Sequence, residues 1–330
     1  MMGIFAAIKP VVVAIIAQAV FRIGSRSLRH PVLWVIAGIS TIAMLVSGAL
    51  FPLILAVAVV IGIVGSRVAP VVFQGGVGHS PSANSGGKAI IDDETETPPH
   101  ARITGWRLVR TVAASLVAWL LPLAALWLSL GPDSSLVEMA LFFSGAALLT
   151  FGGAYAVLPF VFHGAVSAGW ATPTQMVDGL ALGETTPGPL IMFVSFVGFV
   201  GGFAGEFLGA GTSWVSGILA AIVATWFTFL PSFFFILAGG PYVEATRNRT
   251  AFAGPLTAIN SAVVGVVLSL ALVFAQNVFL PANESLDIVG IAIAILAAVA
   301  LFVFKRSVIE VIMWGASLGM IMGLFATFVA

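Results

Sequence analysis

The segment TPTQMVDGLALGETTPGPLIMF, residues 172–193, combines threonines, prolines and glycines at the start of an apolar stretch. Thr186 can cap a helix whose first residue is Pro187, because proline fits where no backbone N–H partner is needed. The N–H groups of Gly188 and Leu190 are then free at the helix start. Such a terminus favours an anion by about 0.3 to 1 kcal/mol. The segment therefore predicts an anion site, and an ordinary capped helix start fits the same residues.

Two acidic residues, Asp178 and Glu184, flank this turn and have no basic residue near them in sequence. Carboxylates beside an anion site repel the ligand unless they are protonated, and protonation there can couple transport to protons. We therefore predict a gating or proton-coupling role for both acids. The alternative is a pair of interfacial acids that face water.

A second unusual segment is LLTFGGAYAVLP, residues 148–159. Adjacent glycines in a helix interior cost about 1 kcal/mol each relative to alanine. Gly152 and Gly153 therefore predict a helix break or a very close approach of two backbones. Tight helix packing through small residues explains them equally well.

The sequence lacks the residues that several other kinds of site require. The chain has no cysteine, which excludes disulfides, cysteine metal sites and thiol nucleophiles. A net charge of zero with a pI of about 6.9 argues against a nucleic-acid partner. No Ser/His, His/Glu or paired-Asp constellation is recognisable, so we expect no enzyme, no metal and no cofactor. The four histidines are scattered without ligand spacing: His30, His79, His100 and His163.

The elements that position these residues follow from the composition. Of 330 residues, 60% are hydrophobic and 8% are charged, against about 25% charged in an ordinary soluble domain. This excludes a soluble enzyme and predicts an all-α, polytopic protein of the lipid bilayer with about ten transmembrane helices. The apolar runs lie near 4–21, 31–47, 50–65, 108–130, 136–162, 187–205, 213–238, 255–276, 288–304 and 307–328.

The basic residues predict which side each span faces. Lys9 lies inside the first run and three arginines follow it, so the run reads as a retained span whose C-terminal end is cytoplasmic, not as a secretory signal. The Gly, Ser, Pro and acid-rich residues 74–100 predict a flexible cytoplasmic linker. Residues 167–186 are too polar and too short to cross, and we expect a re-entrant or cytoplasm-facing segment there.

A weak internal match indicates an inverted-topology repeat. Residues 3–23 align with 254–274 at five identities, and the basic residues follow the first copy but precede the second, so that equivalent elements face opposite sides. About 118 residues, from Leu136 on, precede the second copy, against two before the first. The first half is therefore expected to be truncated or completed by another chain, unless the protein is complete and asymmetric. The predicted organisation is a partial first repeat at 1–65, a flexible linker at 66–107, a connecting transmembrane helix at 108–135 and a complete second repeat at 136–330.

In the two segments TFGGAYAVLP and GWATPTQMVDGLALGETTPGPL the sequence resembles the chromate ion transporter family. The resemblance covers roughly 136–330, and residues 3–65 look like the tail of the family's first half. The glycine and proline motifs of that first half have no counterpart here. The resemblance implies inverted repeats with broken or re-entrant helices, and a multi-pass protein of the bacterial inner membrane.

The activity that the resemblance implies is export of chromate, a divalent oxyanion, with chromate resistance, driven by membrane potential and with proton coupling as an addition. A sulfate or other oxyanion carrier is the alternative of the same class. A non-transporting membrane subunit is the alternative of another class, acting as a homodimer or with a complementary half-transporter chain. The residues expected to shape the oxyanion site are Gly152, Gly153, Tyr155, Thr185, Thr186, Pro187, Gly188 and Pro189, with Asp178 and Glu184 as gating or proton-coupling groups.

Overall fold

The computed structural model describes residues 2–73, 105–150, 154–186, 188–245, 253–280 and 286–329. Within these ranges every regular element is a helix, which confirms the predicted all-α class. Five helices are long and apolar enough to cross a membrane, and six shorter apolar helices accompany them. The chain is therefore a polytopic membrane protein.

The helices follow the apolar runs closely, and most begin or end within a few residues of the expected limits. The first part contains α1 (Met2–Ser27), α2 (Pro31–Val46), the 3₁₀ turn η1 (Gly48–Leu50), α3 (Phe51–Val68), α4 (Pro70–Phe73) and α5 (Gly105–Leu130). The second part contains α6 (Ser135–Leu148), α7 (Ala154–Ser167), α8 (Pro173–Glu184), α9 (Pro189–Gly205), α10 (Ser213–Ala245), α11 (Ala253–Phe279), α12 (Ile288–Phe302) and α13 (Val308–Val329).

The run 136–162 is divided between two helices. α6 ends at Leu148 and α7 begins at Ala154, which confirms the predicted break in this run. The glycine pair expected to cause it, Gly152 and Gly153, lies outside the described residues. A helix can stop inside a membrane only where its free backbone groups are buried in protein or face a water-filled cavity.

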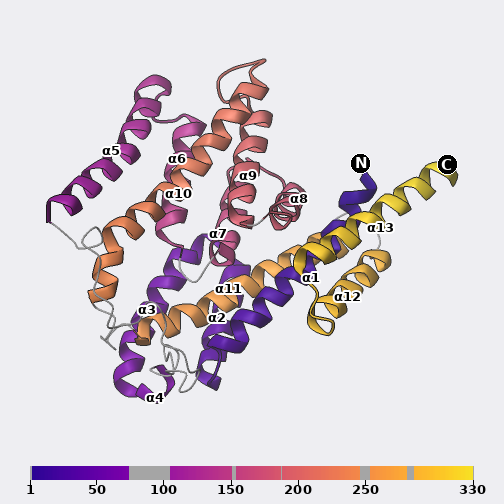
Figure 1. Ribbon diagram of the computed structural model, residues 1–330, viewed down its shortest axis with the longest axis horizontal. Helices are drawn as coiled ribbons and strands as arrows, with labels where there is room; N and C mark the ends of the chain where they lie inside the picture. Colours follow the sequence, from indigo (N-terminus) through magenta and orange to yellow (C-terminus); the bar gives the residue numbers. More distant parts are fainter. Residues whose placement is uncertain are drawn as a thin grey trace, which may run out of the picture.

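Helices α1 and α11 open the two proposed repeats, and each packs against the hairpin of the other. α1 packs against α12 and α13, α11 packs against α2 and α3, and the two helices contact each other (Figure 1). Both crossings use glycines: a Cβ on Gly62 of α3 would lie 2.6 Å from the Gly254 carbonyl of α11, and one on Gly315 of α13 would lie 2.8 Å from a methyl carbon of Val11 on α1. This reciprocal packing is what two inverted copies predict.

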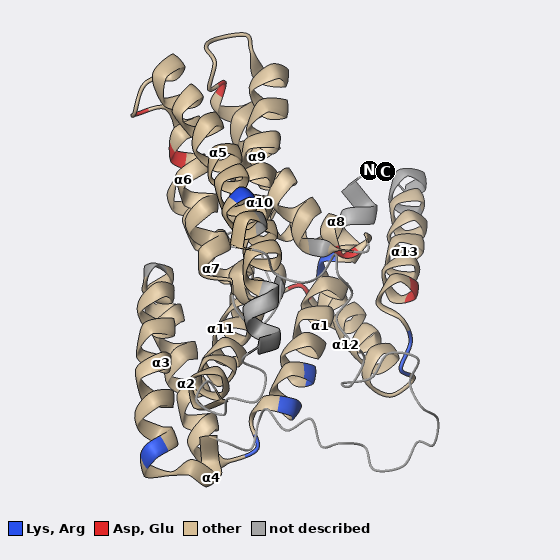
Figure 2. Ribbon diagram, turned by 60° about the vertical axis from the view of Figure 1, so that its left-hand side comes forward, with Lys and Arg blue, Asp and Glu red and all other residues tan. Residues whose placement is uncertain are grey.

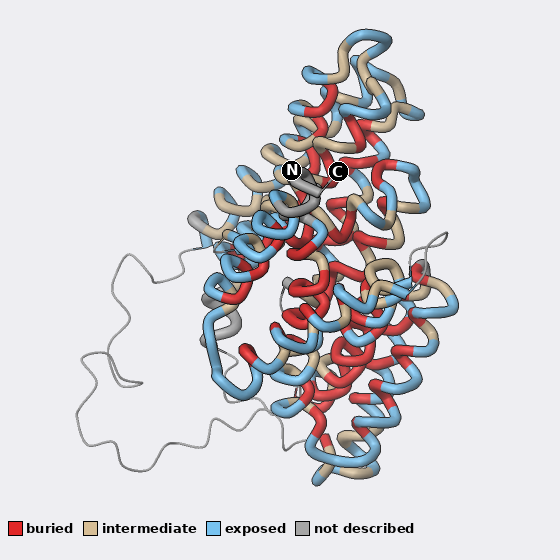
Figure 3. The backbone as a smooth tube through the Cα atoms, turned by 90° about the vertical axis from the view of Figure 1, so that its right-hand side faces the viewer, coloured by how far each residue is buried: buried red, intermediate tan, exposed pale blue. Residues whose placement is uncertain are grey.

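The buried residues lie along the middle of the molecule and the exposed ones along its outside (Figure 3). α11 is the most buried of the five long spans, at 72% of its most apolar window, and α5 is the least, at 0%. α5 is held to its neighbours by two indole N–H groups: Trp119 donates to Ser144 of α6, and Trp226 of α10 donates to the Ala118 carbonyl. α11 therefore lies at the centre of the molecule, packed mainly against α1, α2 and α3, and α5 lies at its edge.

The charged residues separate the two ends of the molecule (Figure 2). Arg26 lies in the last turn of α1 and Arg67 in the last turn of α3. Both helices end at the lower end in that view. The acidic residues of the α5–α6 and α9–α10 turns lie at the upper end. By the positive-inside rule the lower end is the one expected to face the cytoplasm.

Helices occupy both ends of the predicted 66–107 linker. α3 continues to Val68 and α4 follows it, with Phe73 buried and its carbonyl accepting a hydrogen bond from Thr257 of α11. At the other end, α5 begins at Gly105. Residues 74–104 lie outside the described part of the chain, and the repeat boundaries remain a prediction.

Candidate functional site

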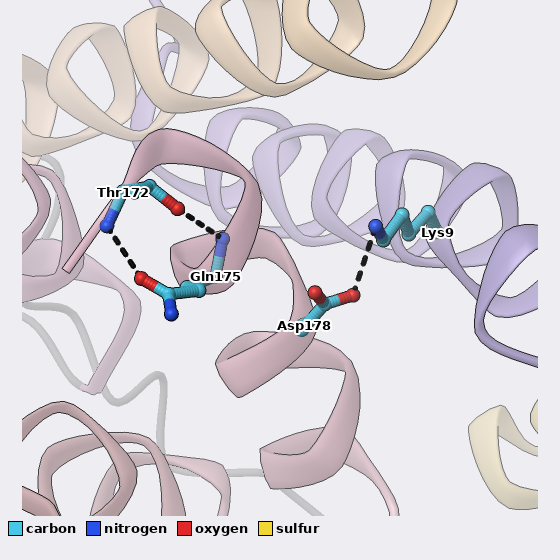
Figure 4. Close-up of polar contacts among 4 residues, drawn as sticks. All are labelled: Lys9, Thr172, Gln175 and Asp178. Carbon is cyan, nitrogen blue, oxygen red and sulfur yellow. Dashed lines mark hydrogen bonds and ion pairs between the residues drawn. The ribbon is translucent and has the colours of Figure 1, made fainter. Parts of the chain in front are cut away.

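Helix α8 carries both acids that the sequence singled out, and its start is fixed by a capping box (Figure 4). The Thr172 hydroxyl accepts from the Gln175 N–H at 3.2 Å, and the Gln175 side chain accepts from the Thr172 N–H at 2.8 Å. Pro173 occupies the first helical position, where it needs no amide partner. These three residues place the start of α8, and hence the direction in which its acids project.

With 12 residues, α8 is about 18 Å long and too short to span the bilayer. It packs against α1, α7, α9 and α11. Its contact with α9 is close, since a Cβ on Gly179 would lie 2.5 Å from the Phe196 ring. The expected non-crossing segment is therefore a helix wedged among helices from both parts of the chain.

Glu184, the last residue of α8, is directed at α7. Its side chain is buried, and its Oε1 accepts a hydrogen bond of 2.9 Å from the Tyr155 hydroxyl. Burial raises the pKa of Glu184 above its ordinary value, and the hydrogen bond from Tyr155 opposes this rise. The structure therefore brings together two predicted site residues, as a pair in which the Tyr155 phenol donates a hydrogen bond to the Glu184 carboxyl group.

Asp178 is directed at α1, where its Oδ1 lies 3.1 Å from the Nζ of Lys9 (Figure 4). No cation lies near Asp178 in the sequence, since Lys9 is 169 positions away. A signal was present, since a lysine inside an apolar run needs an acidic partner in the membrane. The two acids of α8 therefore have different partners on different helices.

The α8–α9 turn differs from its predicted form. The hydroxyls of Thr185 and Thr186 donate to the carbonyls of Leu182 and Gly183, at 2.7 and 2.8 Å, and so close the last turn of α8. The Gly188 N–H, expected to be free, donates to the Thr186 carbonyl at 2.8 Å. Both threonines and the glycine thus have backbone partners in this structure.

The expected helix start at Thr186 and Pro187 is wrong by two residues. α9 begins at Pro189 with Gly188 as its N-cap, and Gly188 has φ +134°. The physical reason is the second proline, because a residue before proline is excluded from the helical region. Glycine then supplies a conformation that other residues rarely adopt.

Three of the predicted site residues, Gly152, Gly153 and Pro187, lie outside the described residues. Where the chain is described, no group of three or more His, Asp or Glu side chains is close enough to hold a metal ion. The site that the structure does build is α8 with its two acids, the Tyr155 phenol and the Lys9 ammonium. Such a set can exchange protons and counter-ions.

Comparison with known proteins places this arrangement in a family. The model of the family described as "Chromate transporter" matches residues 137–320, more than half of the chain. The chain belongs to the chromate transporter family. The match contains α7, α8 and α9, and so the whole turn described above. Membership in this family of transporters, with the apolar helices, makes the chain a multi-pass protein of the bacterial cell membrane.

Curated members of the chromate transporter family share the second part of the chain. The "Chromate transport protein" of Pseudomonas aeruginosa is 36% identical over 173 residues, which are 51% of this chain and 38% of the relative. That of Cupriavidus metallidurans is 27% identical over 184 residues, 56% of this chain and 41% of the relative. The matched region thus spans less than half the length of these relatives. No solved structure matches the chain.

Proposed function

We propose that the chain carries the anion-binding repeat of a chromate carrier that exports chromate from the cytoplasm and confers chromate resistance. The observation that carries this proposal is the Tyr155–Glu184 pair beside the α8–α9 turn, within the region shared with the named chromate transport proteins. Gly152, Gly153, Thr185, Thr186, Pro187, Gly188 and Pro189 would shape the oxyanion site with the phenol.

The pair suggests how a proton could be coupled to the anion. An ionised Glu184 accepts the phenol hydrogen, so Tyr155 has no donor for another ligand. Protonation of the buried carboxyl removes the negative charge beside the site. The protonated carboxyl also no longer requires the hydrogen bond from the Tyr155 hydroxyl. Tyr155 can then donate to an oxyanion oxygen. Proton binding and anion binding would therefore favour each other.

The membrane potential is sufficient to drive export. At about 150 mV, inside negative, moving two negative charges outward releases about 7 kcal/mol. Export on voltage alone is therefore feasible. A proton that leaves with the anion through Glu184 would cancel one of the two charges and halve this electrical driving force, so such coupling would control binding and would not drive export. The same energetics hold for sulfate, which shares the charge and the tetrahedral form of chromate. A sulfate or other oxyanion carrier is thus the alternative substrate assignment.

Gly188→Leu tests the site. At φ +134° a side chain adds strain of about 1–3 kcal/mol, which would move the start of α9. We expect the variant to lose most chromate uptake into everted vesicles. Gly38→Leu is the matched control, because a Cβ on Gly38 has no neighbour within 4 Å. Equal uptake by Gly188→Leu and the wild type would contradict the assignment.

A second candidate is a subunit that forms the carrier only with a complementary half-transporter chain. The relatives favour it, since the matched region is only 38% and 41% of their length. Expression of this chain in a chromate-sensitive host separates the candidates. Protection by the chain alone supports a competent carrier, whereas normal insertion without protection supports the subunit.

A further inference from the structure

We propose that Lys9 is the cationic binding residue for the oxyanion, and that Asp178 occupies its ammonium group when no anion is bound. This inference rests on the proposed oxyanion transport and adds a residue from α1 to it. The pair joins the first part of the chain to the second, across a sequence distance that no local motif spans.

Lys9 lies deep in its helix. Thirteen residues separate it from Arg22, so the two lie about 20 Å apart along α1. Arg22 belongs to the basic end that faces the cytoplasm, and the hydrocarbon core is about 30 Å thick. Lys9 is therefore placed within the core, where a cation is costly unless it has a polar role.

The pair is in direct contact but is poorly supported by other groups. The Nζ of Lys9 lies 3.1 Å from the Oδ1 of Asp178. Asp178 Oδ1 is itself buried and makes no hydrogen bond of acceptable geometry. The side chains keep 24% and 26% of their surface exposed, so the contact is not sealed. A buried ion pair that served stability alone would need further hydrogen bonds to offset its desolvation.

An oxyanion and a carboxylate compete for the same cation. An ammonium group is a compact charge with three donors, and lysine binds tetrahedral anions such as phosphate in this way. Asp178 neutralises Lys9 in the empty state, which keeps an unpaired charge out of the membrane. A divalent anion on Lys9 would be repelled by Asp178 in its present position, so loading requires the pair to separate.

The position of α8 makes this separation consequential. Asp178 holds the middle of α8 to α1, while Glu184 holds its end to Tyr155 of α7. Separation of the Lys9–Asp178 pair releases one of these two polar attachments of α8. Anion binding on α1 would therefore be felt at the α8–α9 turn, which lies in the other part of the chain. Sites between repeats are where secondary transporters bind their substrates.

The test compares two single variants of the purified full chain in nanodiscs, with radiolabelled sulfate and chromate as probes. Lys9→Met should weaken equilibrium binding by about tenfold or more, since it removes a charged donor. Asp178→Asn should tighten binding by about threefold or more, since it removes the competitor and a repelling charge. Lys9→Arg keeps the cation and should keep binding. Arg26→Met and Glu138→Gln, which remove charges away from the pair, should change nothing.

The opposite signs distinguish binding from structure. If the pair only holds the helices together, Lys9→Met and Asp178→Asn will weaken binding alike, and the proposal is overturned. Unchanged binding by Lys9→Met overturns it too, while the proposed oxyanion transport stands. If the wild type binds neither probe but Asp178→Asn does, adding Lys9→Met to Asp178→Asn should abolish that binding, and binding that persists in the double variant overturns the proposal. If no variant binds, both proposals fail. Gel filtration of each variant shows whether a loss of binding is a loss of folding.

Discussion

At the scale of single residues, the carboxyl groups of Glu184 and Glu206 show how local contacts shift a pKa. Glu184 is buried against Tyr155, and burial raises its pKa. Glu206, in the α9–α10 turn, accepts from the Ser213 hydroxyl and the Gly211 N–H, and these hydrogen bonds lower its pKa. The two glutamates should therefore make stability depend on pH in opposite directions.

For Glu184, the folded chain binds the proton more tightly than the unfolded chain. Stability is then greatest below the ordinary pKa of 4.5 and falls as the pH rises towards the folded pKa. Glu184→Gln should remove this loss, so its thermal midpoint in detergent should exceed that of the wild type by a margin that grows with pH. Midpoints measured at one scan rate from pH 4 to pH 8 test this, and a constant margin would contradict the burial argument.

For Glu206 the sign is reversed, which makes it the matched control. Its lowered pKa contributes stability above the ordinary value of 4.5, and this contribution is lost as the pH falls through the folded pKa. Glu206→Gln should therefore melt below the wild type at neutral pH and approach it in acid. If both variants respond to pH in the same direction, the pH dependence has its origin elsewhere in the chain.

The residue types at the site could be predicted from sequence, but their pairings could not. Asp178 and Glu184 stand out because few acids lie near apolar helices, and the segment around them has the family's pattern. Nothing local in the sequence tells that Asp178 meets Lys9 while Glu184 meets Tyr155. Those contacts depend on how α1, α7 and α8 pack, and packing joins residues that are far apart in the chain.

At the scale of elements, apolar runs predicted the helices well because a membrane leaves the backbone few alternatives. Each of the ten runs contains at least one helix. The predictions of helix bounds were wrong where the positions of individual prolines and polar residues determine whether a helix begins or ends. The start of α9 moved to Pro189 because two prolines compete for the first helical position, and α4 was hidden in a segment whose composition predicts a linker.

Helices that cross closely need small residues where they touch. A substitution of Gly265 tests one such crossing. A Cβ on this residue of α11 would collide with the Ala37 carbonyl of α2. Gly265→Ala should therefore destabilise the protein by about 1–3 kcal/mol, the usual cost of overpacking. Gly38→Ala, one position along α2, has no neighbour within 4 Å and should be neutral or stabilising by about 0.5–1 kcal/mol.

Thermal unfolding of both alanine variants in detergent checks this contrast. A midpoint for Gly265→Ala at or above that of Gly38→Ala would mean that α2 and α11 do not cross as closely as the structure has them. The Thr41 hydroxyl of α2 lies 2.9 Å from the Ala37 carbonyl and 3.0 Å from the Gly265 carbonyl and can donate to either, so it joins the two helices at the same crossing.

At the scale of the whole molecule, the reciprocal packing of α1 and α11 is the strongest sign of two inverted copies. The sequence match that suggested it has only five identities over 21 residues, and residue identity is a weak record of shared structure in apolar helices. Helix packing is better evidence for shared structure. Each of the two opening helices lies against the hairpin of the other proposed copy, and glycines lie at both crossings. The arrangement also places Lys9 of the first copy beside α8 of the second.

Cross-linking tests both crossings in a chain without native cysteine. A Cβ on Gly315 lies 3.8 Å from the Cβ of Val11, which suits a disulfide. A Cβ on Gly254 lies 2.6 Å from the Cβ of Ser66, closer than the about 3.5–4.5 Å of a disulfide, so this second bond forms only when α3 and α11 move apart by about 1 Å. Val11→Cys with Gly315→Cys should cross-link α1 to α13, and Ser66→Cys with Gly254→Cys should cross-link α3 to α11. A bond within one chain is visible on a gel only after the chain is cut between the two cysteines. A protease site inserted between residues 74 and 104 therefore reveals the bond between α3 and α11, and one placed in the α11–α12 connection reveals the bond between α1 and α13.

The control keeps the same two helices and changes only the register. Ile321 is exposed on α13 and lies six residues, about 9 Å, beyond Gly315. Val11→Cys with Ile321→Cys should therefore fail to form a bond under the same oxidant. Two inverted copies require both crossings in every molecule, so a chain with all four cysteines should form both bonds together. If the Ser66–Gly254 bond forms in its own double variant but is excluded by the Val11–Gly315 bond when all four cysteines are present, the two crossings belong to different conformations, and the reciprocal arrangement does not describe one folded state.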